Sequence, residues 1–285
     1  MTDVSFSKPP AAAPAYRRII GVAALAMAAL VAGCSTIKLA YESFPSLTYF
    51  WINGYVDLEG DQSPQVREAL ANLHQWHRRN ELPLYAELLT RASQLAPGEV
   101  KAAEVCGLFD DMRTRFVALA EHAEPATATL ATRLTPAQLR NMEEKYADNN
   151  RKFRKEWIDV SREKRLERRY EEILKRSEDF YGRLGPAQRD AIRQQVAQSV
   201  FNPTVALAER VRRQRDAVQT IERLHAANAT VAQARPEIHA WLQRGLRSPD
   251  ADYRAYEQKL RDEGCSGFAA AHATTTPEQR EKARQ

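Results

Sequence analysis

Apolar residues recur at three- and four-residue spacing along most of the chain after residue 62, which is the periodicity of amphipathic helices. In residues 63–76 the apolar positions are Val66, Ala69, Leu70, Leu73 and Trp76. Ser63 and Pro64 precede them, as an N-cap and a first helical residue would. Pro83 should break or kink the following stretch. No window alternates with period two, so the pattern predicts no sheet.

The longest helical stretch begins at Thr135-Pro136 and extends toward Leu184, with a bend expected near residues 159–161. Asn149 falls on its apolar seam, where a polar residue more often sets the register or bonds a neighbouring helix end than performs chemistry. Further helices are expected over residues 186–200, 202–227, 231–246 and 250–265. The predicted fold is therefore all-α: a multi-helix, bundle-like domain of about eight to ten helices with no sheet.

A short element recurs along the chain and is interpreted as repeated helix beginnings. Its copies are Leu95-Ala96-Pro97-Gly98-Glu99, Leu134-Thr135-Pro136-Ala137-Gln138, Leu184-Gly185-Pro186-Ala187-Gln188 and Thr275-Thr276-Pro277-Glu278-Gln279. Proline opens the first turn, and the Glu or Gln two positions later engages free backbone N–H groups. The spacing between copies is irregular, so the element is not a solenoid repeat.

The N-terminus carries a targeting pattern. The basic residues Lys8, Arg17 and Arg18 precede a thirteen-residue apolar run, Ile19–Val31. This run is shorter than the roughly 20 residues that a membrane span needs, and the order of basic, apolar and small residues is that of a secretory signal. The alternatives are an uncleaved signal anchor, or a cleaved signal followed by a chance cysteine.

Residues 30–34, Leu-Val-Ala-Gly-Cys, resemble a lipobox. The resemblance implies cleavage after Gly33, diacylation of the Cys34 thiol and acylation of the new amine, so that Cys34 becomes the lipid-bearing first residue. Ser35 follows, and by analogy with other lipoproteins the absence of Asp there favours the inner leaflet of the outer membrane of a Gram-negative cell. The expected divisions are a signal peptide (1–33), a lipid-anchored aromatic segment (34–60), a helical domain (61–273) and a polar tail (274–285).

Six aromatic residues follow the anchor within fifteen positions: Tyr41, Phe44, Tyr49, Phe50, Trp51 and Tyr55. Aromatic rings with polar tips suit a membrane interface, and they suit a helix packed in a protein core equally well. We favour core packing, because Asn53, Asp57 and Glu59 quickly return the segment to polar surroundings. In both cases almost no linker separates the domain from the bilayer.

The chain has 42 basic and 37 acidic residues and three cysteines. This near balance argues against a nucleic-acid partner, because such proteins usually carry a one-sided basic face. Besides Cys34, only Cys106 and Cys265 remain, and in an oxidising periplasm an even pair suggests a disulfide with one possible connectivity. The alternative is two buried free thiols.

His74, His77 and Glu81 share one helical face and are weak candidates for metal ligands. Half-buried structural histidines are the favoured interpretation, because three ligands on one helix rarely converge. The sequence contains no nucleophile elbow and no phosphate-binding glycine loop. We therefore expect no enzyme activity, no catalytic residue and no cofactor.

The chain also resembles a family of uncharacterised proteobacterial lipoproteins, a domain of unknown function. The residues that carry this resemblance are Cys34-Ser35-Thr36, Pro45-Ser46-Leu47, Trp76-His77-Arg78-Arg79, Leu82-Pro83-Leu84-Tyr85, Lys145-Tyr146, Asn149-Asn150, Phe153-Arg154-Lys155-Glu156-Trp157 and Tyr253-Arg254-Ala255-Tyr256. The resemblance implies an outer-membrane-type lipoprotein with no established activity, so it assigns no functional residue.

Residues 134–138 resemble the Leu-Thr-x-x-Gln motif of small helical periplasmic stress chaperones. The copy at Leu184 has Gly185 in place of Thr, the copy at Thr275 lacks the leading Leu, and helix capping alone explains the same residues. Three hypotheses follow. A structural or interaction protein of the cell envelope with an unidentified protein partner ranks first, a chaperone-like binder of unfolded or outer-membrane clients second, and a metal-dependent enzyme last.

Overall fold

A computed structural model of the chain describes residues 38–284. The chain divides into two units, Met1–Thr48 and Tyr49–Gln285, and each is described by itself. The predicted signal peptide (1–33) and Cys34 lie outside the described residues. The boundary falls within the segment that was predicted to extend to residue 60, because Tyr49 and the residues after it pack with the helices that follow.

Eleven α-helices and one short π-helical segment lie wholly within the described residues, which contain no strand. They are α2 (Phe44–Val56), α3 (Gln62–Trp76), η1 (His77–Glu81), α4 (Leu82–Leu95), α5 (Ala102–Ala131), α6 (Pro136–Trp157), α7 (Arg162–Tyr181), α8 (Pro186–Gln198), α9 (Pro203–Ala226), α10 (Val231–Leu246), α11 (Ala251–Ala273) and α12 (Pro277–Arg284). The all-α prediction is confirmed. Nine of the α-helices, α3 to α11, lie within residues 61–273, in agreement with the eight to ten helices expected for the helical domain, while α2 and α12 lie outside it.

Pro83 does not break the chain, because a wider turn accommodates it. Proline lacks an N–H, and its ring would clash with the carbonyl four residues earlier, that of Arg79. The π-helical segment η1 includes Arg79, and Pro83 stands in the first turn of α4. The helical path thus continues from α3 through η1 into α4, and a π-helical turn is a recognised cause of a helix kink.

Two local predictions were wrong in detail. Ser63 is not an N-cap: α3 starts at Gln62, and the Ser63 hydroxyl accepts a hydrogen bond from the Tyr49 hydroxyl at 3.1 Å. The element at Leu95 does not begin a helix, because α5 starts only at Ala102. In the polar segment after residue 273, the element at Thr275 does begin a helix, α12, which packs on α7 and α4.

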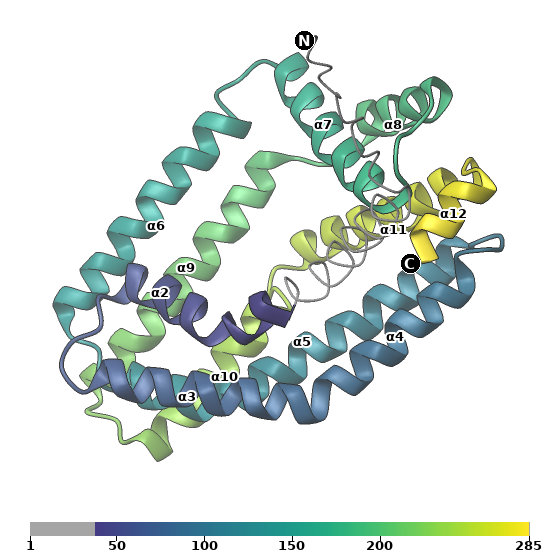
Figure 1. Ribbon diagram of the computed structural model, residues 1–285. Helices are drawn as coiled ribbons and strands as arrows, with labels where there is room; N and C mark the ends of the chain where they lie inside the picture. Colours follow the sequence, from purple (N-terminus) through teal and green to yellow (C-terminus); the bar gives the residue numbers. More distant parts are fainter. Residues whose placement is uncertain (1–37, 285) are drawn as a thin grey trace, which may run out of the picture. The chain divides into compact units, whose positions relative to one another are not determined.

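Helices of the second unit pack mainly as pairs that lie side by side in space, and several of these pairs are far apart in the sequence (Figure 1). Helix α5 contacts α10, α11, α3 and α4, while α6 lies along α9 and α7 along α8. The largest cluster of buried residues joins α2, α5, α6, α9 and α10 and includes Ala128, Leu139, Leu224 and Ile238. A separate cluster joins α7 to α8 around Tyr170 and Ile192. The hydrophobic core is therefore divided among several helix contacts.

The starts of α3 and α6 are joined by two glutamines, each at the third position of a capping arrangement. The Gln62 Oε1 accepts the Glu59 N–H (3.0 Å), and the Gln138 Oε1 accepts the Thr135 N–H (2.9 Å). The two carboxamides also bond each other, with the Gln138 Nε2 2.6 Å from the Gln62 Oε1. Gln138 is 1% exposed, so this polar junction is buried and its amide groups are hydrogen-bonded.

Helix α6 also holds the end of α2. The Asn149 Nδ2 donates to the Tyr55 hydroxyl at 2.6 Å, and the Asn141 Nδ2 donates to the Tyr55 carbonyl at 2.7 Å. The Tyr55 ring packs against Tyr146 at 5.6 Å between centroids. Asn149 therefore bonds a neighbouring helix, which is the structural role expected for a polar residue on the seam.

Cys106 on α5 and Cys265 on α11 lie together as a disulfide, with their Cα atoms 5.4 Å apart and a sequence separation of 159. Cys265 is buried beside Val100 and Val105. The bond links the first half of the helical unit to its last long helix. Among residues 38–284, no helix combines the length and the apolar character needed to cross a membrane.

Candidate functional site

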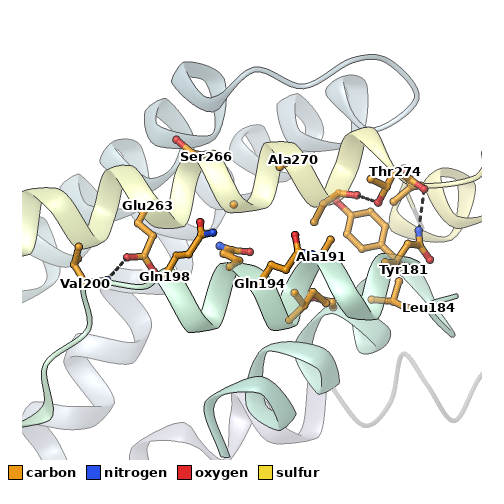
Figure 2. A pocket seen from close by; sticks show the side chains of 17 residues that line it. Tyr181, Leu184, Ala191, Gln194, Gln198, Val200, Glu263, Ser266, Ala270 and Thr274 are labelled. Carbon is orange, nitrogen blue, oxygen red and sulfur yellow. Dashed lines mark hydrogen bonds between the residues drawn. The ribbon is translucent and has the colours of Figure 1, made fainter. Parts of the chain in front are cut away.

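A groove of about 600 Å³ lies between α8 and α11, with the end of α7 closing one side (Figure 2). Gln194 and Gln198 project from α8, while Glu263 and Ala270 belong to α11. The volume is in the usual range for ligand pockets. We name this feature the α8–α11 groove.

A glycine sets the distance between the two walls. A β-carbon at Gly267 on α11 would fall on the carboxamide of Gln195 on α8, whereas a β-carbon at Gly264 would meet open space. Glycine in a helix interior costs about 1 kcal/mol relative to alanine. Gly267 therefore allows the Gln195 side chain to lie against the backbone of α11, inside the groove.

One end of the groove is held by a buried hydrogen-bond chain. The Tyr181 hydroxyl lies 2.9 Å from the His272 Nδ1, and the His272 Nε2 lies 3.0 Å from the Gly98 carbonyl oxygen. A carbonyl oxygen can only accept, so Nε2 carries the proton, and in the neutral ring Nδ1 accepts from Tyr181. Burial raises the pKa of Tyr181 to about 12, which keeps the phenol protonated.

The opposite end contains the only charged side chain among the groove-lining residues, that of Glu263. Its Oε2 accepts the Val200 N–H at 2.9 Å, and its Oε1 lies 3.3 Å from the Arg169 Nη2. Burial lowers the pKa of Arg169, and the charge of Glu263 opposes that shift. The Arg169 guanidinium also lies over the Phe201 ring, 4.4 Å from its centroid. The carboxylate is therefore neutralised by a structural ion pair.

The middle of the groove combines an apolar floor with carboxamide groups. Ile192 and Ala270 contribute apolar surface. The side-chain carboxamides of Gln194, Gln195 and Gln198 form no hydrogen bond with another described residue, so their donors and acceptors face the groove or solvent. Each carboxamide offers two N–H donors and one carbonyl acceptor. The groove suits a neutral ligand that presents both kinds of hydrogen-bonding group.

His74, His77 and Glu81 do not form a metal centre. His74 lies on α3 and the other two lie in η1, and no group of three or more potential ligands comes together within the described residues. The Glu81 carboxylate is buried and lies 3.7 Å from the Arg115 Nη1, while the His77 ring packs on Tyr85. Burial lowers the pKa of His77, which disfavours its charged form.

Sequence reasoning missed the groove residues. The signal was a row of glutamines in residues 188–198 together with Gly264 and Gly267 in one helix. Neither pattern is informative alone, because exposed glutamines are common on helix surfaces. Only the packing of α8 on α11, two helices separated by two others in the chain, brings the patterns together.

The fold and the groove define an all-helical protein, cross-linked by a disulfide, with a neutral groove between two of its helices. The chain belongs to the Family of unknown function (DUF6279), which matches residues 54–262 and so includes α8 and the first half of α11 but not the groove-lining residues of α11 from Glu263 onward. No curated protein and no solved structure matches the chain.

Proposed function

We propose that this protein is a non-enzymatic lipoprotein of the bacterial envelope that binds a segment of another polypeptide in the α8–α11 groove. The observation that carries the binding role is the set of free carboxamides above an apolar floor. A peptide bond presents one N–H and one carbonyl, and a glutamine side chain can pair with both. Such pairing is independent of the partner's side chains, while Ile192 and Ala270 offer contacts to its apolar residues.

The anchoring part of the proposal depends on the lipobox-like residues 30–34. Acylation of Cys34 would fix the protein to a membrane, since two acyl chains already give stable attachment. Ser35 after the cysteine favours the outer membrane, where the helical unit would face the periplasm. A disulfide between Cys106 and Cys265 agrees with an oxidising compartment.

A chaperone-like role in holding unfolded clients would use the same groove. The chaperone-like motif at residues 134–138 has a structural explanation, because Thr135 and Gln138 form the helix start that is joined to α3. A binding protein for one envelope partner is therefore the preferred proposal. The two differ in selectivity, since a chaperone would bind many unrelated unfolded chains.

The groove can be tested with the full chain and a defined probe. The probe is a short, uncharged, fluorescein-labelled peptide of alternating leucine and serine, and binding is followed by fluorescence anisotropy. Gly267→Leu would place a side chain in the groove, whereas Gly264→Leu makes the same change on the same helix in open space. We expect Gly267→Leu to weaken binding at least about tenfold, which is 1.4 kcal/mol, and Gly264→Leu to leave it unchanged. Equal affinities for both variants, or no binding by the unaltered chain, would overturn the groove assignment.

Anchoring is tested separately in cells by incorporation of labelled palmitate. Cys34→Ser should abolish labelling and release the chain from the membrane fraction, while Ser35→Ala should keep both. Labelling that persists in Cys34→Ser would refute lipidation at this residue without touching the groove.

A further inference from the structure

Helix α2 has one buried face and one exposed face. Tyr49 and Val56 are buried against the helices that follow, whereas the Phe50 and Trp51 side chains are each 65% exposed. Gly54 lies one turn further on the exposed face, and a β-carbon there would meet nothing within 4 Å. The Phe50 ring contacts Tyr49 and the Trp51 ring contacts Tyr55, but both large aromatic side chains remain mostly exposed.

This helix also differs from all others within the described residues, because it contains no charged side chain. The complete chain has 28% charged residues, so a surface helix without any is unusual here. Exposed apolar surface is unfavourable in water, and adjacent exposed aromatics usually mark an interaction site. The exposed face of α2 is therefore expected to have an occupant.

We propose that Phe50 and Trp51 lie in the interfacial region of the bilayer to which Cys34 is attached. The inference rests on the proposed lipid anchor and not on the α8–α11 groove. Trp51 follows Cys34 by only seventeen positions, with no long flexible linker between them. Tryptophan is enriched at membrane interfaces, where its ring is apolar and its indole N–H can reach water or headgroups.

A basic side chain beside this face matches an anionic lipid surface. The exposed Arg67 guanidinium lies 3.5 Å from the centroid of the Tyr49 ring and 6.0 Å from that of Phe50. A cation next to interfacial aromatics is attracted to anionic headgroups. The lipid supplies attachment, and this face supplies orientation, because two contact points restrict how the helical unit turns on the membrane.

The test uses the full, acylated chain in vesicles of phosphatidylethanolamine and phosphatidylglycerol, with and without bromine on the acyl chains. Bromine quenches tryptophan fluorescence only at close approach. The chain has four tryptophans, of which Trp51 is the one on the exposed face of α2. We expect brominated lipid to quench part of the fluorescence, and Trp51→Phe to abolish that part while the protein stays folded. A quenched fraction that is the same in Trp51→Phe, or no quenching at all, would overturn the proposal.

A charge substitution provides the matched pair. Phe50→Glu keeps Trp51, should turn the helical unit away from the bilayer, and should reduce the quenched fraction to that of Trp51→Phe. Leu89→Glu changes an equally exposed apolar residue on α4, 69% exposed, and should leave the quenching unchanged. Protection of Trp51 from an aqueous quencher that rises with protein concentration but not with lipid would identify a second copy as the occupant and refute membrane contact. Palmitate labelling in the same samples reports the anchor independently, so loss of docking and loss of anchoring are distinguishable.

Discussion

Gln188 and Gln279, 91 residues apart, bond each other through their carboxamides while each caps the start of its own helix. The Gln188 Oε1 accepts the Gly185 N–H at 2.8 Å, and the Gln279 Oε1 accepts the Thr276 N–H at 3.0 Å. Each Nε2 also reaches across to the chain just before the other helix. The starts of α8 and α12 are thereby fastened to each other by the same arrangement as those of α3 and α6.

The arrangement repeats with the same offsets. The Gln188 Nε2 donates to the Thr274 carbonyl and the Gln279 Nε2 to the Arg183 carbonyl. In the first junction, the Gln62 Nε2 donates to the Arg133 carbonyl and the Gln138 Nε2 to that of Asp57. In all four cases the acceptor lies two residues before the residue whose N–H donates to the partner glutamine's Oε1, namely Glu59, Thr135, Gly185 or Thr276. Three of the four copies of the recurring element, those at Leu134, Leu184 and Thr275, therefore take part in joined helix starts.

The first prediction concerns this junction. Gln138→Ala should lower the free energy of unfolding by about 2–4 kcal/mol, because it removes several hydrogen bonds and leaves buried partners unsatisfied. In the Gln138→Ala background, Gln62→Ala should lower the free energy of unfolding by much less than it does in the unaltered chain, with a coupling energy of about 0.5–3 kcal/mol. Urea unfolding measures both. Gln243→Ala, an exposed glutamine on α10, serves as the control and should change stability by less than about 0.5 kcal/mol. Strict additivity of the two junction substitutions would contradict the arrangement.

Local signals in the sequence predicted most helices but not the junctions. Helix α10 has the predicted bounds, Val231–Leu246, and α9 begins at the predicted Asn202-Pro203. These starts are encoded within a few residues, by a cap residue in both helices and by a proline at the first position of α9. Which glutamine pairs with which depends on how distant parts of the chain pack. Gln62 is preceded by Leu58-Glu59 but has no proline two positions before it, so it was not recognised as a copy of the element.

The second prediction concerns the disulfide. Replacing both Cys106 and Cys265 by alanine should lower the free energy of unfolding by about 2–4 kcal/mol, chiefly because the unfolded chain gains freedom. Thermal unfolding followed by circular dichroism measures the change. Cys34→Ser retains the cross-link and should unfold like the unaltered chain. An effect of added reductant on Cys34→Ser but none on the double variant would support the bond, whereas no effect on either would contradict it.

The third prediction is a loss of stability at alkaline pH. The unfolded tyrosine ionises near pH 10, while the folded pKa of Tyr181 is raised to about 12. Between these values the unfolded chain releases a proton that the folded chain retains, so stability falls as pH rises, at no more than about 1.4 kcal/mol per pH unit. Tyr181→Phe should remove this component, seen as a smaller slope of unfolding free energy between pH 10 and 12.

At neutral pH the same substitution acts through His272. Without the Tyr181 hydroxyl, the buried Nδ1 of His272 loses its donor, and stability should fall by about 1–3 kcal/mol. If Tyr181→Phe left both the neutral stability and the alkaline slope unchanged, the buried hydrogen-bond chain at the end of the groove would not exist as described.

The candidate site was beyond sequence reasoning for a physical reason. A groove is defined by which helix faces which, and α8 contacts α11 only after α9 and α10 have intervened. The His74 and Glu81 spacing, by contrast, was visible but misleading, because the π-helical turn at His77–Glu81 changes the angular positions that a regular helix would give. Regular periodicity predicts facing side chains only where the helix stays regular.

The last prediction uses the two glycines of α11. Gly264→Ala should raise the free energy of unfolding by up to about 1 kcal/mol, because alanine favours the helix and its methyl group meets open space. Gly267→Ala should give a smaller gain or none, since the methyl group displaces the Gln195 carboxamide from its place against α11. In a Gln195→Ala background the obstacle is absent, so Gly267→Ala should recover the full gain seen at position 264. Urea unfolding of the four single and double variants measures this coupling, and equal gains at both positions in the unaltered background would show that Gln195 does not lie in the groove.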